Sequence, residues 1–303
     1  MAHDHDHGGS ARRAGARHQG RLLAALVVLA VFMVVEVATA LLTHSLGLLS
    51  DAGHMVTDVV GLGMAVAAIR VASRGREHPQ RTFGLYRLEI LAALANAVLL
   101  FGVAGYIAVE AVRRLSQPTH VITGPVLVVA LLAVAANLVA FALLRGGAAD
   151  SLNVRAAYLE VMSDTIGSVG VVVGAVVLRY TGWSWVDPVV GIAIGVFILP
   201  RTWKLAGQAI RILVQAAPPG VDLDGITSDL RSLGGVVDVH DLHVWTLTSD
   251  MEVASAHLMV SNGTDAHRVL DEARDLMVDR YEITHATFQV EPEDHEGCQE
   301  VSW

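Results

Sequence analysis

The chain has 303 residues, of which 53% are hydrophobic, with a formal net charge of −9 and a mean hydropathy of +0.51. A composition this apolar excludes an ordinary soluble domain of this length. The single cysteine, Cys298, excludes an intrachain disulfide, so nothing in the sequence points to an oxidising compartment.

The charge is divided between two regions of opposite sign. Residues 1–216 carry 17 Arg and Lys against 12 Asp and Glu, a net charge of +5, whereas residues 217–303 carry four Arg and 18 Asp and Glu, a net charge of −14. Nucleic acid needs a basic surface, so we expect no nucleic-acid partner. An acidic domain suits a surface that attracts cations.

The first 20 residues form a hydrophilic tail in which His3, His5 and His7 alternate with aspartate. The tail lacks the apolar stretch and cleavage site of a signal peptide. The alternation differs from that of an ordinary hexahistidine tag, although an engineered tag remains the alternative. We predict a cytoplasmic segment, residues 1–20, that attracts metal ions.

Six apolar segments follow, each long enough for a membrane-spanning helix, which needs about 20 residues. They cover residues 22–43, 48–72, 88–112, 123–145, 153–178 and 186–210. With the N-terminus inside, the inner segments hold 14 Arg and Lys and the outer loops hold three. The sequence therefore predicts a six-helix transmembrane domain, residues 21–214, in the bilayer of the cell (inner) membrane, with both termini in the cytoplasm.

Residues 215–292 have the pattern of a compact α+β module. Helices are predicted at 223–233 and 265–281, and strands at 236–248, 251–260 and 286–291. The order α-β-β-α-β fits a small ferredoxin-like sheet with both helices on one face. Residues 293–303 are expected to form a flexible tail.

Ionisable residues occur inside the predicted spans, where burial of charge is costly and usually serves a function. His54 and Asp58 are four residues apart in the second span, and Glu160 and Asp164 are four apart in the fifth. Each pair lies on one helix face, so two facing helices would offer one imidazole and three carboxylates to one point. Four such ligands suit a tetrahedral zinc site. Structural polar contacts between helices are the alternative.

Two more acidic residues are candidates for accessory roles. Glu36, in the first span, would lie in an inner cavity or hold a proton. Asp51 lies three residues before His54. A role at the start of the helix or in packing fits Asp51 as well as a role in transport does.

Several segments together resemble the cation diffusion facilitator family of cobalt–zinc–cadmium and zinc transporters. SLGLLSDAGHMVTD (45–58) resembles the second-span signature of that family. TFGLYRLEILAAL (82–94) and SLNVRAAYLEVMSDTIGSV (151–169) resemble its third and fifth spans, and HDLHVWTLTSD and THATFQVEP resemble its C-terminal domain. The likeness covers residues from about 20 to 292.

The resemblance implies a function that residue spacing alone does not show. Members are homodimers, joined partly through the cytoplasmic domain, that export Zn²⁺ and often Co²⁺ or Cd²⁺ in exchange for protons, and they are not enzymes. Their transport ligands match His54, Asp58, Glu160 and Asp164. Many zinc transporters of the family have histidine where this chain has Glu160, which makes the site richer in oxygen. We therefore expect a broader selectivity that includes Cd²⁺, Co²⁺ or Mn²⁺.

The resemblance also implies a regulatory metal site in the C-terminal domain. It favours His240 and His257 as ligands, with His285 and Glu291 as further candidates. Ordinary polar residues on strands are the alternative. His240 and His243, three residues apart, are expected to point to opposite faces of the sheet.

His78 occupies a loop where some members bind a minor metal ion, although a solvated histidine would look the same. Two other functions fit intramembrane metal ligands. An intramembrane metalloenzyme is disfavoured because the sequence holds no HExxH-like arrangement. A membrane-anchored metal sensor would bind metal without moving it. The sequence favours a metal/proton antiporter that works by alternating access.

Overall fold

The computed structural model describes residues 27–74, 83, 85, 87–145, 152–248 and 251–294. The predicted N-terminal tail, His78 and Cys298 lie outside the described residues. The chain divides into two compact units, one made of residues up to Gly63 together with Asn96–Trp203, and the other of Met64–Ala95 together with Lys204–Trp303.

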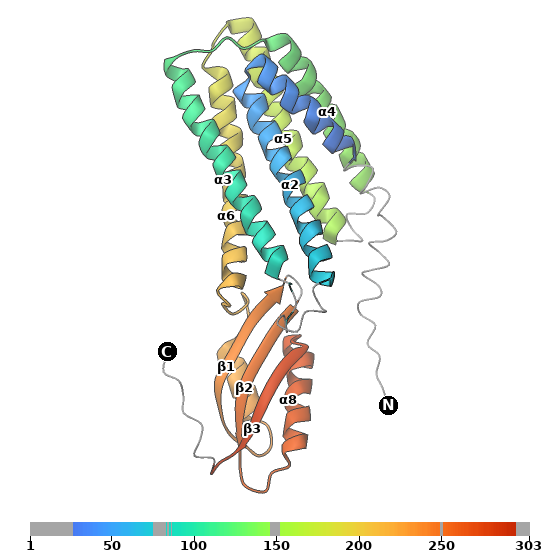
Figure 1. The fold of residues 1–303 in the computed structure, drawn as a ribbon, viewed down its shortest axis with the longest axis vertical. Helices are drawn as coiled ribbons and strands as arrows, with labels where there is room; N and C mark the ends of the chain where they lie inside the picture. Colours follow the sequence, from blue (N-terminus) through green and yellow to red (C-terminus); the bar gives the residue numbers. More distant parts are fainter. Residues whose placement is uncertain are drawn as a thin grey trace. The chain divides into compact units, whose positions relative to one another are not determined.

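In the part of the chain that the structure describes, helices precede the C-terminal domain near the positions that the hydropathy pattern predicts (Figure 1). They are the first helix, Val27–Thr43, and then α2 (Leu46–Arg74), α3 (Arg87–Ser116), α4 (Thr123–Arg145), α5 (Leu152–Thr181) and α6 (Val186–Leu213). In the described part of the chain, four helices are long and apolar enough to cross a membrane: α3, α4, α6 and the Tyr158–Thr181 part of α5. The first helix is apolar but shorter, and the largely apolar sequence of α2 includes Asp51, His54 and Asp58.

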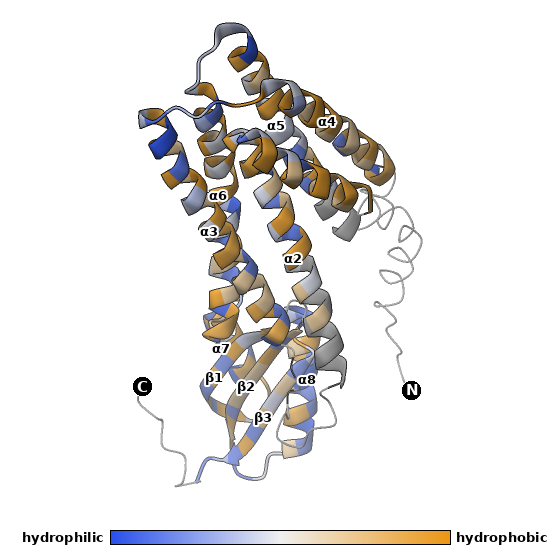
Figure 2. Cartoon of the chain, turned by 45° about the horizontal axis from the view of Figure 1, so that its top comes forward, coloured by the Kyte–Doolittle hydropathy of each residue, from blue (hydrophilic) through white to orange (hydrophobic). Residues whose placement is uncertain are grey.

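The outer faces of these helices are apolar, and hydrophobic colours cover most of α4 and α5 in Figure 2. Large apolar side chains stand exposed on several helices, among them Leu42 of the first helix at 75% and Val109 of α3 at 71% exposure. A soluble protein rarely exposes so much contiguous apolar surface. Lipid contact explains it, because helices satisfy their backbone hydrogen bonds internally and can therefore lie in a bilayer.

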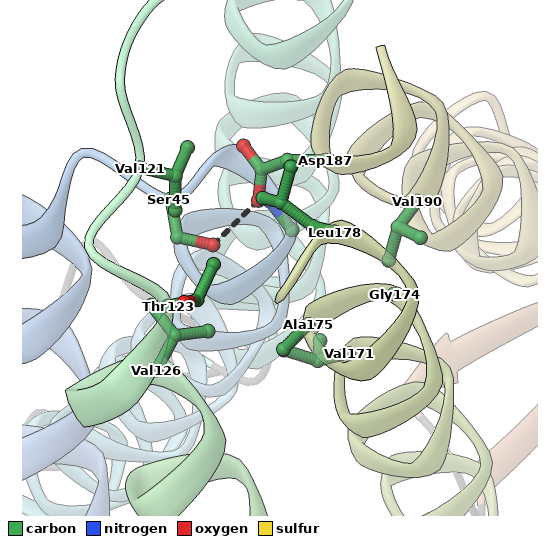
Figure 3. A pocket seen from close by; sticks show the side chains of 11 residues that line it. Ser45, Val121, Thr123, Val126, Val171, Gly174, Ala175, Leu178, Asp187 and Val190 are labelled. Carbon is green, nitrogen blue, oxygen red and sulfur yellow. Dashed lines mark hydrogen bonds between the residues drawn. The ribbon is translucent and has the colours of Figure 1, made fainter. Parts of the chain in front are cut away.

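The start of α2 is fixed by Asp187, in the first turn of α6 (Figure 3). The hydroxyl of Ser45 donates a hydrogen bond to Asp187 Oδ1 at 2.6 Å, and the backbone amides of Leu46 and Gly47 donate to the same carboxylate at 2.6 and 3.2 Å. A carboxylate is favourable at a helix N-terminus, where amide groups lack partners. The cavity beside Ser45 measures only about 10 Å³, which is room for one water molecule at most.

Glycines allow the helices of this unit to approach closely. A Cβ atom on Gly174 of α5 would lie 2.7 Å from Cγ2 of Val190 on α6, and one on Gly53 of α2 would lie 2.8 Å from Cγ1 of Val103 on α3. At either position a larger residue would therefore force its neighbour to shift. Small residues of this kind let helices pack closely in a membrane.

The C-terminal domain contains α7 (Leu223–Arg231), β1 (Val236–Thr248), β2 (Met251–Val260), α8 (Ala266–Tyr281) and β3 (His285–Pro292). The sheet has the order β1-β2-β3, with β1 and β2 antiparallel and β2 and β3 parallel. The core joins Ile226 and Leu230 of α7 and Val269 and Met277 of α8 to buried strand residues such as Leu258. Both helices thus cover one face of the sheet, as the element order predicts.

Strand β1 contains a bulge that corrects one expectation. His240 pairs with His257 while His243 pairs with Ser255, so β1 has one more residue than β2 in this interval. Asp241, inside it, has a positive φ of 50°. His257 and Ser255 are two apart and share a face, so His240 and His243 share that face as well. The expectation that these two histidines point to opposite faces is wrong, because simple alternation assumes an unbroken ladder.

Candidate metal centres

His54 of α2 lies at the centre of the predicted transport ligands. Its Nε2 atom is 3.5 Å from Asp58 Oδ2, 3.6 Å from Glu160 Oε1 and 3.5 Å from Asp164 Oδ1. The structure therefore brings all four residues together around one nitrogen. Ligand atoms of His54, Glu160 and Asp164 lie within 4.8 Å of one another, close enough to hold one metal ion.

The helices place these groups because each ligand pair repeats once per helical turn. Asp58 follows His54 by one turn on α2, and Asp164 follows Glu160 by one turn on α5. His54 and Asp164 are buried, whereas Asp58 and Glu160 are half-buried. Three carboxylates and one imidazole in such a place need cationic compensation, which a divalent ion would supply.

A cavity of about 200 Å³ lies beside these ligands. His54 and Asp164 line it, as do Asp51 and Arg201, and apolar side chains of α6 complete the wall. The ligands therefore adjoin a space large enough for a hydrated ion to enter.

The structure adds Arg201 of α6 to this site, a residue that sequence reasoning missed. Its guanidinium donates to Glu160 Oε2, the oxygen that does not face His54. The two residues are 41 positions apart, and nothing in their spacing pairs them. The one available signal is a basic residue directly after Pro200, inside the helix, and Lys204 and Arg211 of the same helix are basic as well.

Glu36 and Asp51 lie beside the same cluster. Asp51 accepts a hydrogen bond from Ser168 of α5 at 2.8 Å, so it lies inside α2 and links two helices. Glu36 is fully buried, and neither carboxyl oxygen has a hydrogen-bond partner among the described residues. The charges of Asp51 and Asp164 both act on it. Two further buried acids therefore adjoin the four ligands.

A second group of candidate ligands lies on the face of the sheet away from α7 and α8. His240 Nε2 is 3.8 Å from Glu291 Oε2, and His257 Nδ1 is 2.9 Å from Glu291 Oε1. The two imidazole rings are 5.1 Å apart, centroid to centroid. Glu291 is only 3% exposed, and Gln289 donates to its Oε1 at 2.6 Å. These three residues could hold one ion.

His285 is not part of that group. It begins β3 and pairs with Val253, four positions along the ladder from the pair formed by His257 and Gln289. His243 lies on the correct face, but it is exposed and is separated from His240 by the bulge. The structure thus brings His240, His257 and Glu291 together, and places His285 elsewhere.

Apolar helices around a group of candidate metal ligands, followed by a small acidic domain, are typical of a membrane transporter for cations. The chain belongs to the cation efflux family. The model of the cation efflux transmembrane domain matches residues 22–214, and that of the cation efflux protein cytoplasmic domain, ZT_dimer, matches residues 218–293. The predicted family is confirmed, and it is one of transporters and not of enzymes.

Similar proteins match along nearly the whole chain. The metal cation efflux system protein CzcD of Cupriavidus metallidurans is 43% identical over 95% of this chain and 89% of its own. The zinc transporter ZitB of Escherichia coli is 36% identical over 96% of this chain and 93% of its own. The cadmium, cobalt and zinc/H⁺-K⁺ antiporter of Bacillus subtilis is 33% identical over 97% and 93%.

Among solved structures, the metal-bound C-terminal domain of the CzcD transporter from Cupriavidus metallidurans is similar to part of this chain. It is 33% identical and covers 23% of this chain and 99% of its own, with a TM-score of 0.23.

Proposed function

We propose that this protein exports a divalent transition metal from the cytoplasm in exchange for protons, with Zn²⁺ as its first substrate. The observation that carries the proposal is the position of His54, within 3.6 Å of carboxylates from two different helices. An ion bound there is held by α2 and α5 at once. Movement of one helix against the other would therefore open or close the site.

The proposed cycle is alternating access across six membrane spans, with both termini in the cytoplasm. Metal enters from the cytoplasm and binds His54, Asp58, Glu160 and Asp164. After the helices repack, protons on the same groups displace the metal on the other side. Imidazole is suited to this exchange because it titrates near neutral pH, and metal binding requires deprotonated ligands. Glu36 and Asp51 are the proposed accessory acids that hold a proton beside the site.

The proposed substrates extend to Cd²⁺, Co²⁺ and Mn²⁺. Three carboxylates and one imidazole form a hard, oxygen-rich ligand set, which discriminates less strongly for zinc than a set with more nitrogen. The names of the relatives support this range, since they include cadmium, cobalt and zinc.

We further propose that the protein is a homodimer joined through its C-terminal, ferredoxin-like domain, and that metal at His240, His257 and Glu291 regulates transport. The match to a family model named for a dimer supports the first part. The buried carboxylate of Glu291 between two histidines supports the second, because a bound cation would compensate its charge.

Flux of Zn²⁺ into proteoliposomes of the purified full-length protein tests the proposed function. We expect flux that depends on an imposed pH gradient and disappears in Asp58→Ala, with Asp279→Ala of α8 as a control that transports normally. A protein that binds zinc but moves none under any gradient would instead be a metal sensor. Flux that does not depend on the pH gradient would refute proton exchange but not metal export.

A further inference from the structure

Arg201 is a permanent cation among the ligands of the proposed substrate ion. It pairs with Glu160, and the charges of Asp58 and Asp164 also act on it. It lines the same cavity as His54 and Asp164. One guanidinium therefore pairs with one of the four proposed ligands and is influenced by the charges of two others.

A guanidinium keeps its proton at every pH at which proteins stay folded. The charge of Arg201 therefore stays in the cavity at every stage of the proposed cycle. A divalent ion on Glu160 would lie within a few ångströms of that charge, close enough for the two cations to repel each other. Arg201 and the metal ion consequently compete for one carboxylate. The Arg201 side chain is 60% exposed and has room to turn away.

We propose that Arg201 is an internal counter-ion of the metal-free site: it pairs with Glu160 when the site is empty and is displaced when the metal binds. This inference rests on the proposed function. The pair offsets one of three carboxylate charges in the empty site. It lowers the affinity for metal, and so it helps the ion to leave after the helices repack.

The same geometry gives a reason for glutamate at position 160. A neutral imidazole there would offer Arg201 no charge to pair with, and the guanidinium would then only repel the metal. Glu160 and Arg201 therefore act as one unit. Substituting either residue should change the effect of substituting the other.

The test is the affinity of the purified full-length protein for Zn²⁺, measured by competition with a chromogenic chelator, together with proteoliposome flux. We expect Arg201→Gln to bind Zn²⁺ at least about tenfold more tightly than wild type, because the repulsion of two nearby cations is lost. Its maximal flux should fall severalfold, because release is slower. Arg201→Lys, which keeps the charge, should stay within about threefold of the wild-type affinity.

Matched variants separate this role from a structural one. Lys204→Gln, an exposed cation three residues further along α6, should change neither affinity nor flux. In a Glu160→Gln background, Arg201→Gln should still tighten binding but by a smaller factor, because the repulsion of the ion persists there while the competition for the carboxylate is gone. Arg201→Met, which keeps the aliphatic stem, replaces Arg201→Gln if that variant does not fold.

The direction of the change decides the matter. If Arg201 only holds Glu160 in place for the metal, then removing Arg201 weakens binding. A weaker or unchanged affinity of Arg201→Gln for Zn²⁺ therefore overturns the inference. The proposed function still stands in that case, provided that the wild-type protein transports Zn²⁺. Wild-type protein that neither binds nor transports Zn²⁺ overturns both.

Discussion

The hydroxyl of Ser45 donates a hydrogen bond to the carboxylate of Asp187, 142 residues further along the chain, at 2.6 Å. Arg114 of α3 lies 3.7 Å from the same carboxylate. One acidic side chain therefore joins the start of α2, which carries His54 and Asp58, to α6 and α3. The stability of this end of the helix bundle should depend on it.

Replacing Asp187 should lower stability markedly. Asp187→Ala leaves the Ser45 hydroxyl and two backbone amides without their acceptor in a buried place, at a cost of about 3 kcal/mol. Asp187→Asn keeps one acceptor oxygen and should cost about half as much. Thermal unfolding of the purified protein in detergent measures both, with exposed Gln117→Ala as a control that stays near wild type. Equal melting temperatures for all four proteins would show that this carboxylate is dispensable.

Glu160→His should narrow the metal selectivity. The substitution exchanges a hard oxygen ligand for imidazole, which favours Zn²⁺ over Mn²⁺. We expect the ratio of zinc to manganese transport to rise on the order of tenfold, the scale on which ligand changes alter metal affinity. A proteoliposome panel of Zn²⁺, Cd²⁺, Co²⁺ and Mn²⁺ measures it. An unchanged ratio would mean that position 160 does not set selectivity.

The two histidines of β1 should differ in their effect on metal binding. In an Asp58→Ala background, which disables the transport site, His240→Ala should reduce the bound Zn²⁺ by one ion per chain at equilibrium dialysis. His243→Ala is the matched control, since it removes an exposed imidazole from the same face of the same strand. Equal losses in both variants would argue against the group of His240, His257 and Glu291.

Tyr281, at the end of α8, should titrate at unusually high pH. Burial, and the hydrogen bond that its hydroxyl donates to Asp229 of α7, raise its pKa from 10.0 to about 12. A raised pKa means that the folded protein holds this proton more tightly than the unfolded chain. The resulting stability is complete below pH 10 and is lost as the pH rises towards 12.

The difference in tyrosinate absorbance between wild type and Tyr281→Phe measures that titration directly. Its midpoint should lie near pH 12. Tyr281→Phe should also destabilise the domain by about 1 kcal/mol below pH 10. A midpoint near pH 10 for Tyr281 would contradict the role of Asp229.

Local patterns in the sequence predicted most of the helices, strands and ligand pairs. Hydropathy located the helices to within a few residues, because a span must be apolar along its whole length. Helical periodicity brought Asp58 to His54 and Asp164 to Glu160, because residues four apart share a face. The helices and the two ligand pairs could be predicted without knowing which helices are neighbours. Only the joining of the two pairs required the assumption that α2 faces α5.

Contacts between distant segments were not predictable in this way. The pairing of Arg201 with Glu160 depends on how α6 packs beside α5, which no local pattern encodes. The grouping of His240 and His257 without His285 depends on strand register, which sets the pairs His240–His257 and Val253–His285. The bulge at Asp241 also escaped prediction, because one extra residue leaves no signature in the composition.

That bulge has a consequence for comparing this chain with its relatives. The side chains of β1 alternate between the two faces of the sheet, and this alternation shifts by one residue number at Asp241. One inserted residue accounts for the shift. Deleting that residue would leave His240 opposite His257 and His243 opposite Ser255 in an unbroken ladder, with Val244 still facing the helices. A gap of a single position here is therefore a change in the backbone alone, since a relative one residue shorter in this interval can bury the same set of side chains.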